Sequence, residues 1–197
     1  MAFPDTAELE SIVAPVAVRH GLDVEAIKTV KAGKKSQVTI AISGDEAPTL
    51  DQLEDISNEV SLLFDEAEER GELNFGAGYT LEVTTPGIDL PLTLPRHWRR
   101  NRGRVVAVRF GEGMAPANGG KDGTLYRIGA VNSDDTEVVL VSHAEKGRKH
   151  TPRAIAVRFD QVENAVVEIE FGKPNEAELA LANAEFTQLT DDNQQDK

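Results

Sequence analysis

A proline-broken stretch at the middle of the chain, TTPGIDLPLTLP at residues 84–95, constrains the fold more than any other feature. Each of its three prolines lacks a backbone N–H and fixes φ, so neither a helix nor a central strand continues through it. The hydrophobic periodicity also differs between its two sides. We therefore predict an N-terminal domain at 1–85, an interdomain linker at 86–95, a C-terminal domain at 96–172, and an acidic, partly disordered tail at 173–197.

The N-terminal half contains two helical and three strand-like periodicities. Residues 6–20 and 50–70 repeat apolar side chains at helical spacing. Strands are predicted at 22–31, where the apolar phase slips at Ile27, and at 38–42 and 79–83, with a hairpin turn at 33–35. Both helices must bury an apolar face, most simply against one side of a three-stranded sheet, so we predict an α/β domain.

The C-terminal half has short strands, turns and no long helical period. Such a succession predicts a small β-barrel, and therefore an α+β chain as a whole. Strands are predicted near 105–108 and at 123–131, 137–142, 153–159 and 165–171, with a short helical turn at 160–164. In the tail, Leu179, Ala182, Phe186 and Leu189 have helical spacing, which allows one short helix.

Several classes of function lack the residues they require. The sequence has no cysteine, which excludes disulfides, thiolate metal sites and cysteine nucleophiles. The four histidines follow no metal-ligand spacing, and the sequence has no P-loop or nucleophile-elbow motif. No basic leader precedes an apolar run, and no window approaches the roughly 18 apolar residues of a membrane span. We predict a cytoplasmic, non-enzymatic protein with no cofactor, no metal site and no membrane partner.

Charge is distributed unevenly along the chain, whose formal net charge is -13. Residues 1–90 contain 6 lysines and arginines against 18 aspartates and glutamates, whereas residues 91–172 contain 13 against 10. An acidic half joined to a mildly basic half suggests partners of opposite sign. An acidic surface also aids solubility, and the charge totals alone favour that simpler interpretation.

The densest basic run follows the linker directly. Within nine positions it contains Arg96, His97, Arg99, Arg100, Arg102 and Arg104, together with Trp98. Arginine suits phosphate because its planar guanidinium donates two parallel hydrogen bonds and stays protonated. We favour RNA or ribonucleoprotein binding for the group, and a core position for Trp98. For any single arginine, an ion pair that fixes the linker to the acidic domain stays an open alternative.

The linker itself is too apolar for a free tether. Its side chains Ile88, Leu90, Leu92 and Leu94 need cover. We therefore expect the linker to pack between the two domains and to restrict their relative orientation.

The region 78–110 resembles the signature of the bacterial RimP family of ribosome maturation factors. In that family a strand reading Leu-Glu-Val runs into two hydroxyl residues, Pro-Gly, an aliphatic residue, Asp and Pro-Leu, followed by a basic-aromatic segment and Gly-Arg. The corresponding linker residues here are Thr84, Thr85, Pro86, Gly87, Asp89, Pro91 and Leu92, and the Gly-Arg pair is Gly103 and Arg104. Two departures are visible: Leu90 replaces the usual arginine, and threonines replace the more usual serines.

The resemblance implies an N-terminal α/β domain and a C-terminal SH3-like or Sm-like barrel. It implies a non-enzymatic factor that binds the immature small ribosomal subunit and helps to place ribosomal protein there. The basic run would meet ribosomal RNA. On the acidic domain, Glu59, Glu66 and Glu69 would meet a basic small-subunit ribosomal protein, which is our own hypothesis from the charge distribution. Monomer is the simplest oligomeric state.

Two other functions compete with this one. The first is a general RNA-binding or regulatory module built on an Sm-like barrel, which would bind arbitrary RNA as well as the immature subunit. The second is an enzyme acting on RNA, which would need a cluster of carboxylates or a metal site that the sequence does not display.

Overall fold

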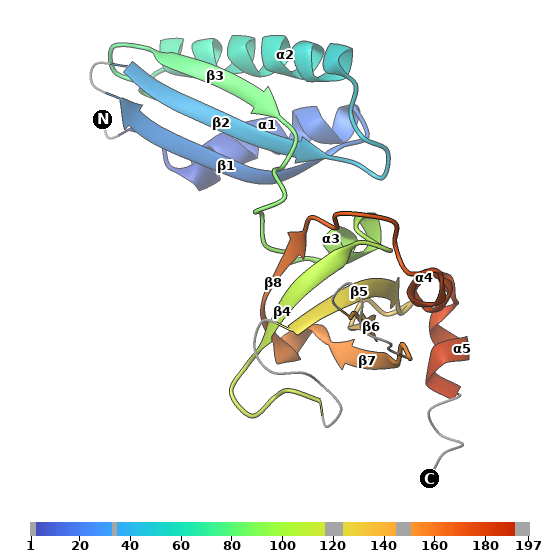
Figure 1. Cartoon of the computed structure of the whole chain (residues 1–197). Helices are drawn as coiled ribbons and strands as arrows, with labels where there is room; N and C mark the ends of the chain where they lie inside the picture. The colour runs from blue at the N-terminus through green and yellow to red at the C-terminus, as the bar shows by residue number, and fades with distance from the viewer. Residues whose placement is uncertain (1–2, 33–34, 117–123, 145–150, 192–197) are drawn as a thin grey trace. The chain divides into compact units, whose positions relative to one another are not determined.

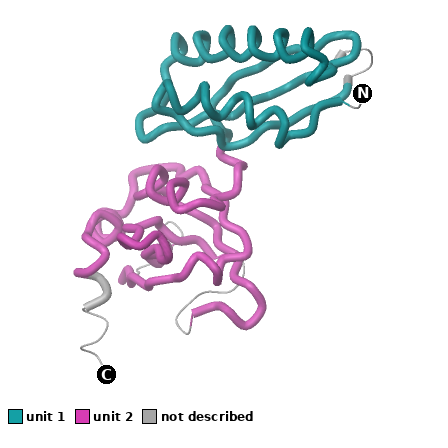
Figure 2. Tube along the Cα trace, turned by 180° about the vertical axis from the view of Figure 1, so that it is seen from behind, with its two compact units in different colours: residues 1–87 teal, residues 88–197 magenta. Residues whose placement is uncertain are grey.

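The computed structural model describes residues 3–32, 35–116, 124–144 and 151–191. Predictions for the turn at 33–34, for parts of the loops at 117–123 and 145–150, and for the end of the tail at 192–197 fall outside these residues. The chain divides into two compact units, unit 1 at Met1–Gly87 and unit 2 at Ile88–Lys197 (Figure 2). Within the described ranges, no helix is long and apolar enough to cross a membrane.

Unit 1 has the predicted order of helix, strand, strand, helix, strand. Its elements are α1 (Thr6–Arg19), β1 (Asp23–Ala32), β2 (Lys35–Ser43), α2 (Leu50–Glu69) and β3 (Tyr79–Thr84) (Figure 1). The three strands form one sheet in the order β1-β2-β3, with β1 antiparallel and β3 parallel to β2. The register of β1 shifts between Val24 and Ala26, beside the irregularity expected at Ile27.

The helices of unit 1 begin where their sequences provide reciprocal caps. The Asp5 side chain accepts a hydrogen bond from the backbone N–H of Glu8, whose side chain accepts one from the backbone of Asp5. Thr49 and Gln52 repeat this arrangement at the start of α2. Such capping boxes satisfy backbone donors that a helix start otherwise leaves unpaired.

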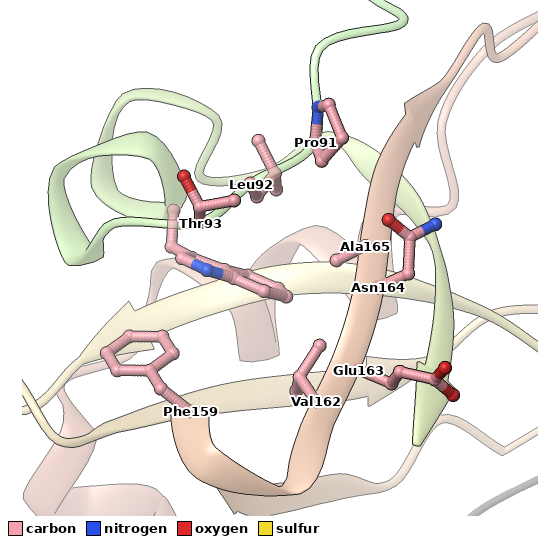
Figure 3. Close-up of a pocket in the computed structure, with 9 residues that line it drawn as sticks. Pro91, Leu92, Thr93, Phe159, Val162, Glu163, Asn164 and Ala165 are labelled. Carbon is pink, nitrogen blue, oxygen red and sulfur yellow. The ribbon is translucent and has the colours of Figure 1, made fainter. Parts of the chain in front are cut away.

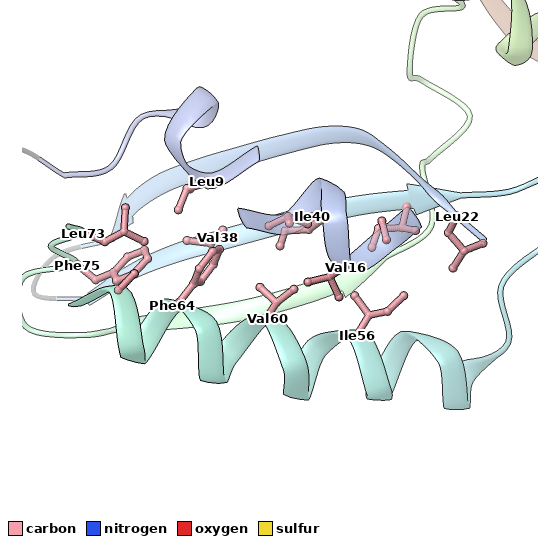
Figure 4. Close-up of a cluster of buried hydrophobic side chains, with 14 residues drawn as sticks. Leu9, Val16, Leu22, Val38, Ile40, Ile56, Val60, Phe64, Leu73 and Phe75 are labelled. Carbon is pink, nitrogen blue, oxygen red and sulfur yellow. The ribbon is translucent and has the colours of Figure 1, made fainter. Parts of the chain in front are cut away.

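Both helices bury their apolar stripes against the same sheet face, as predicted. Figure 4 shows Ile56, Val60 and Phe64 of α2 directed toward the strands, where Val38 and Ile40 of β2 meet them. These side chains are completely buried. The opposite side of the helix pair consequently faces solvent, and on α2 this side includes Glu59, Glu66 and Glu69.

Unit 2 is built on one antiparallel sheet of five strands in the order β7-β6-β5-β4-β8. The elements are α3 (Pro95–Arg100), β4 (Val105–Phe110), β5 (Thr124–Val131), β6 (Glu137–Ser142), β7 (Ala154–Arg158), the one-turn 3-10 helix η1 (Phe159–Gln161), β8 (Val162–Glu168), α4 (Glu176–Asn183) and α5 (Phe186–Asp191). Strand pairing in the described part ends at β7 and β8, so the predicted barrel is not closed by hydrogen-bonded strands. The α+β class itself is confirmed.

The last strand of unit 2 lies earlier in the sequence than predicted. Strand β8 begins at Val162, three residues before the predicted start, and ends at Glu168 rather than at 171. A register shift between Arg109 and Phe110 of β4 allows Phe110 to pair with Val162, which extends β8 at its start. The predicted helical turn accordingly lies earlier, at Phe159–Gln161.

Helices α4 and α5 cover a second face of the sheet. The predicted single helix is interrupted at Ala184, whose backbone is extended. Ala182 of α4 packs on Val139 and Val141 of β6, and Phe186 lies at the edge of this small cluster. Strand β6 is therefore buried on both faces, since Val138 and Leu140 belong to the main core of unit 2.

Candidate functional site

The arginine run begins in the short helix α3. Pro95 occupies a first-turn position, where a missing N–H costs nothing. His97 is buried, and its Nδ1 accepts hydrogen bonds from the backbone N–H groups of Thr93 (3.1 Å) and Leu94 (3.2 Å). The acceptor role of Nδ1 places the proton of the neutral ring on Nε2. His97 thus fixes the start of the helix, and little of its surface faces solvent.

Trp98 belongs to the core of unit 2, as predicted. It is buried, and its ring lies 5.8 Å from the ring of Phe159, measured between centroids. A cavity of about 170 Å³ lies beside it, between the Pro91–Thr93 segment and strand β8 (Figure 3). Leu92 donates its backbone N–H to the carbonyl of Ala165 at 2.8 Å, which ties this part of the linker signature to unit 2.

The remaining signature residues form the connection between β3 and unit 2. Thr84 ends β3, paired with Ala41 of β2, and Thr85 follows it. Pro86 and Gly87 then close unit 1, and Asp89 is an exposed residue at the start of unit 2. The expected packing of the linker between the two domains stays a prediction.

The predicted arginines have different surroundings. Arg99 is exposed and forms an ion pair with Asp135, a residue of the β5–β6 turn. Arg102 donates hydrogen bonds of 2.8 Å to the carbonyl oxygens of Ala182 and Ala184, at the end of α4. Arg104 donates to Oδ1 of Asn101 at 2.9 Å and is also exposed. Arg96 and Arg100 are half-buried. Arg99, Arg102 and Arg104 are therefore the more exposed arginines of the run.

Gly103, which lies between Arg102 and Arg104, has an unusual backbone conformation. Its φ of 82° lies in the left-handed region, which glycine adopts without steric penalty. Its N–H donates to the carbonyl of Ile128 at 2.8 Å, and its own carbonyl accepts from Nη1 of Arg127 at 2.8 Å. The Gly-Arg pair of the signature thus turns the chain while exposing Arg104.

The three predicted acidic residues all lie on α2. Glu59 pairs with Arg19 and lies 3.4 Å from Nε2 of His20, and the hydrogen bond from Arg19 lowers the pKa of its carboxyl. Glu66 lies 3.7 Å from the guanidinium of Arg70. Glu69, the last residue of α2, is exposed. The fold thus brings all three to the solvent side of one helix.

A buried ionic cluster in unit 2 was not predicted from the sequence. Arg127 of β5 donates to Glu170 at 2.6 and 3.0 Å and to Glu178 of α4 at 3.0 and 3.1 Å. Nδ1 of His143 lies 2.7 Å from the same Glu178 carboxylate. Burial opposes the charge of Arg127, but its bonds to Glu170 and Glu178 raise its pKa on balance. The cluster attaches α4 to the sheet.

One sequence signal could have indicated this arrangement. Arg127 interrupts an otherwise apolar strand, and the neighbouring strand contains the continuous run Val138–Val141 instead of an alternation. A continuous apolar run is typical of a strand covered on both faces. Within the described residues, no three His, Cys, Asp or Glu side chains are arranged to hold a metal ion.

Comparison with known proteins places the chain in a family. A model described as the RimP N-terminal domain matches residues 12–89. Proteins named ribosome maturation factor RimP from Corynebacterium aurimucosum and Corynebacterium diphtheriae are each 47% identical, covering 94% and 100% of both chains respectively. A relative of the same name from Corynebacterium kroppenstedtii is 44% identical over 96% of this chain and 100% of its own. The chain therefore belongs to the RimP family of ribosome maturation factors.

Proposed function

We propose that the protein binds the immature small ribosomal subunit in the cytoplasm and promotes its assembly as a monomeric, non-enzymatic factor. The observation that supports this most strongly is the near-complete coverage of relatives named as ribosome maturation factors. The two units would divide the work by charge. Unit 2 would contact ribosomal RNA, and unit 1 would contact a basic small-subunit ribosomal protein.

The proposed RNA surface consists of Arg99, Arg102 and Arg104 around the end of α3. Each has exposed surface on the same short stretch of unit 2. Phosphate oxygens accept hydrogen bonds in the plane of a guanidinium, so such arginines suit an RNA backbone without reading its sequence. The supporting scaffold would be an SH3-like or Sm-like barrel, since all five short antiparallel strands contribute side chains to one apolar core cluster.

The proposed protein surface is the solvent side of α2 with Glu59, Glu66 and Glu69. Carboxylates attract lysines and arginines and repel RNA phosphates, so this surface would select a basic protein in the presence of RNA. A factor with both surfaces would hold a ribosomal protein close to the RNA that receives it.

Co-sedimentation tests this proposal directly. The purified protein is mixed with immature small subunits, mature small subunits and whole ribosomes across a series of salt concentrations. We expect selective binding to the small subunit, strongest for the immature form. Equal binding to all three, or to unrelated RNA of equal length, would instead support a general RNA-binding module. The absence of binding at low salt would overturn the proposal.

A further inference from the structure

The C-terminal turns of α2 have a charge that disfavours the helix. Its 20 residues, all of which the structure describes, include eight aspartates and glutamates and no lysine, arginine or histidine. Asp65, Glu66, Glu68 and Glu69 lie in its last turns, where the negative end of the helix dipole disfavours carboxylates. Asp65 and Glu68 accept hydrogen bonds within unit 1, from the Tyr79 hydroxyl and the Phe75 backbone N–H, whereas Glu66 and Glu69 are exposed. A positively charged partner would offset their charge.

An exposed leucine lies within this acidic face. The side chain of Leu62 is 65% exposed. Glu59 precedes it by three positions, and Glu66 and Glu69 follow it by four and seven, so all three lie on the same side of the helix as Leu62. Interfaces are commonly organised in this way, with an apolar side chain at the centre and polar side chains around it.

The end of α1 extends the same surface. Val18 is 67% exposed, and its neighbour Arg19 forms the ion pair with Glu59 that joins α1 to α2. Both helices cover one face of the sheet (Figure 4). The sides of α1 and α2 that face away from the sheet therefore form one surface. We name Val18, Leu62 and the carboxylates of Glu59, Glu66 and Glu69 the helix-layer surface.

We infer that the helix-layer surface docks a basic protein segment that inserts an apolar side chain against Leu62, between its lysine or arginine contacts. The inference rests on the proposed function and adds the anchoring contact and the chemistry of the bound segment. Charge complementarity selects this occupant. RNA phosphates are repelled by the carboxylates, and a second copy of the chain would bring two acidic surfaces together.

The apolar contact and the charged contacts have different experimental signatures. Loss of a buried leucine contact weakens binding by a similar factor at every salt concentration, whereas loss of a carboxylate reduces the dependence of affinity on salt. Leu50 provides a matched control, because it is an exposed leucine at the first turn of the same helix. Glutamine has about the helix propensity of leucine, so Leu→Gln changes leave helix stability nearly unaltered.

The test titrates the full chain with the proteins of the small subunit, stripped of RNA and purified individually. We expect a basic protein to bind, Leu62→Gln to weaken it roughly tenfold at every salt concentration, and Leu50→Gln to leave it unchanged. Glu66→Gln with Glu69→Gln should reduce the salt dependence. Unchanged melting temperatures would show that the variants remain folded.

The possible failures are distinguishable. If a basic protein binds the wild-type chain and Leu62→Gln binds it equally well, the leucine anchor is wrong while the proposed function stands. If none of the purified proteins binds the wild-type chain, both are overturned. If Leu62→Gln abolishes self-association in analytical ultracentrifugation and leaves ribosomal-protein binding intact, the surface serves a second copy, and the inference is wrong.

Discussion

Arg127 of β5 and Glu178 of α4, 51 residues apart in the sequence, share hydrogen bonds of 3.1 and 3.0 Å, and both side chains are buried. A guanidinium in this position needs its carboxylates, because an unpaired buried charge is far more costly than a buried pair. The pair therefore makes helix α4 an integral part of unit 2.

Removal of one partner should destabilise unit 2 strongly. We expect Glu178→Gln to lower the free energy of unfolding by roughly 3 kcal/mol, since Arg127 loses one of its two carboxylates. Trp98 is the chain's only tryptophan and lies in unit 2, so its fluorescence during urea unfolding measures this change. Glu176→Gln is the control, because its ion pair with Lys173 is exposed and should contribute less than about 0.5 kcal/mol.

Acid should weaken the same cluster in a predictable direction. The hydrogen bond from Arg127 holds the pKa of Glu170 below its ordinary value of 4.5, although burial opposes the shift. A lowered folded-state pKa stabilises the protein above the ordinary pKa, and this stabilisation is lost as the pH falls through the folded value. Urea midpoints followed by Trp98 fluorescence should therefore fall more steeply below pH 4.5 in the wild type than in Glu170→Gln. Parallel curves would contradict this assignment.

Local periodicity was sufficient to predict unit 1 and much of unit 2. The apolar stripe of α2 and the alternation in β3 depend on neighbours within a few positions. The buried position of Trp98 was also confirmed. These features need no knowledge of distant contacts.

The long-range parts of unit 2 could not be predicted in the same way. Arg102 was predicted to bind RNA from its place in a basic run, yet two of its donors reach carbonyls 80 and 82 residues away. The partners of Arg127 are similarly distant. Such contacts depend on where the tail returns to the sheet, which no periodicity within the tail specifies.

The contacts of Arg102 predict a stabilising role besides any RNA contact. We expect Arg102→Gln to lower the free energy of unfolding of unit 2 by about 1–2 kcal/mol, since two charge-assisted hydrogen bonds to the end of α4 are lost. Hydrogen exchange in α4 should also accelerate. Arg158→Gln is the comparison, because Arg158 is exposed and its ion pair is with Asp160, only two positions away. Equal stability of the two variants would count against a role for Arg102 in holding α4.

The signature glycine before Arg104 should be intolerant of a side chain. Gly103 has a φ of 82°, so Gly103→Ala should destabilise unit 2 by about 1–2 kcal/mol from backbone strain. Its Cβ would meet only Leu179 at an ordinary 3.9 Å, so crowding adds little. Gly87→Ala is the matched control, because that signature glycine does not adopt a positive φ. Urea unfolding of both variants distinguishes strain from a general intolerance of alanine.

Salt dependence separates RNA contact from structural roles within the arginine run. Each phosphate contact adds roughly 0.7–0.9 to the slope of log affinity against log salt. We expect Arg99→Gln with Arg104→Gln to weaken binding to immature small subunits and to reduce that slope by between about 1 and 2. Arg109→Gln with Arg158→Gln is the control, because these exposed arginines lie in unit 2 outside the run and pair with Glu163 and Asp160. If both pairs of substitutions change the slope equally, unit 2 attracts RNA by its overall charge, and the residues around α3 do not form a distinct binding surface.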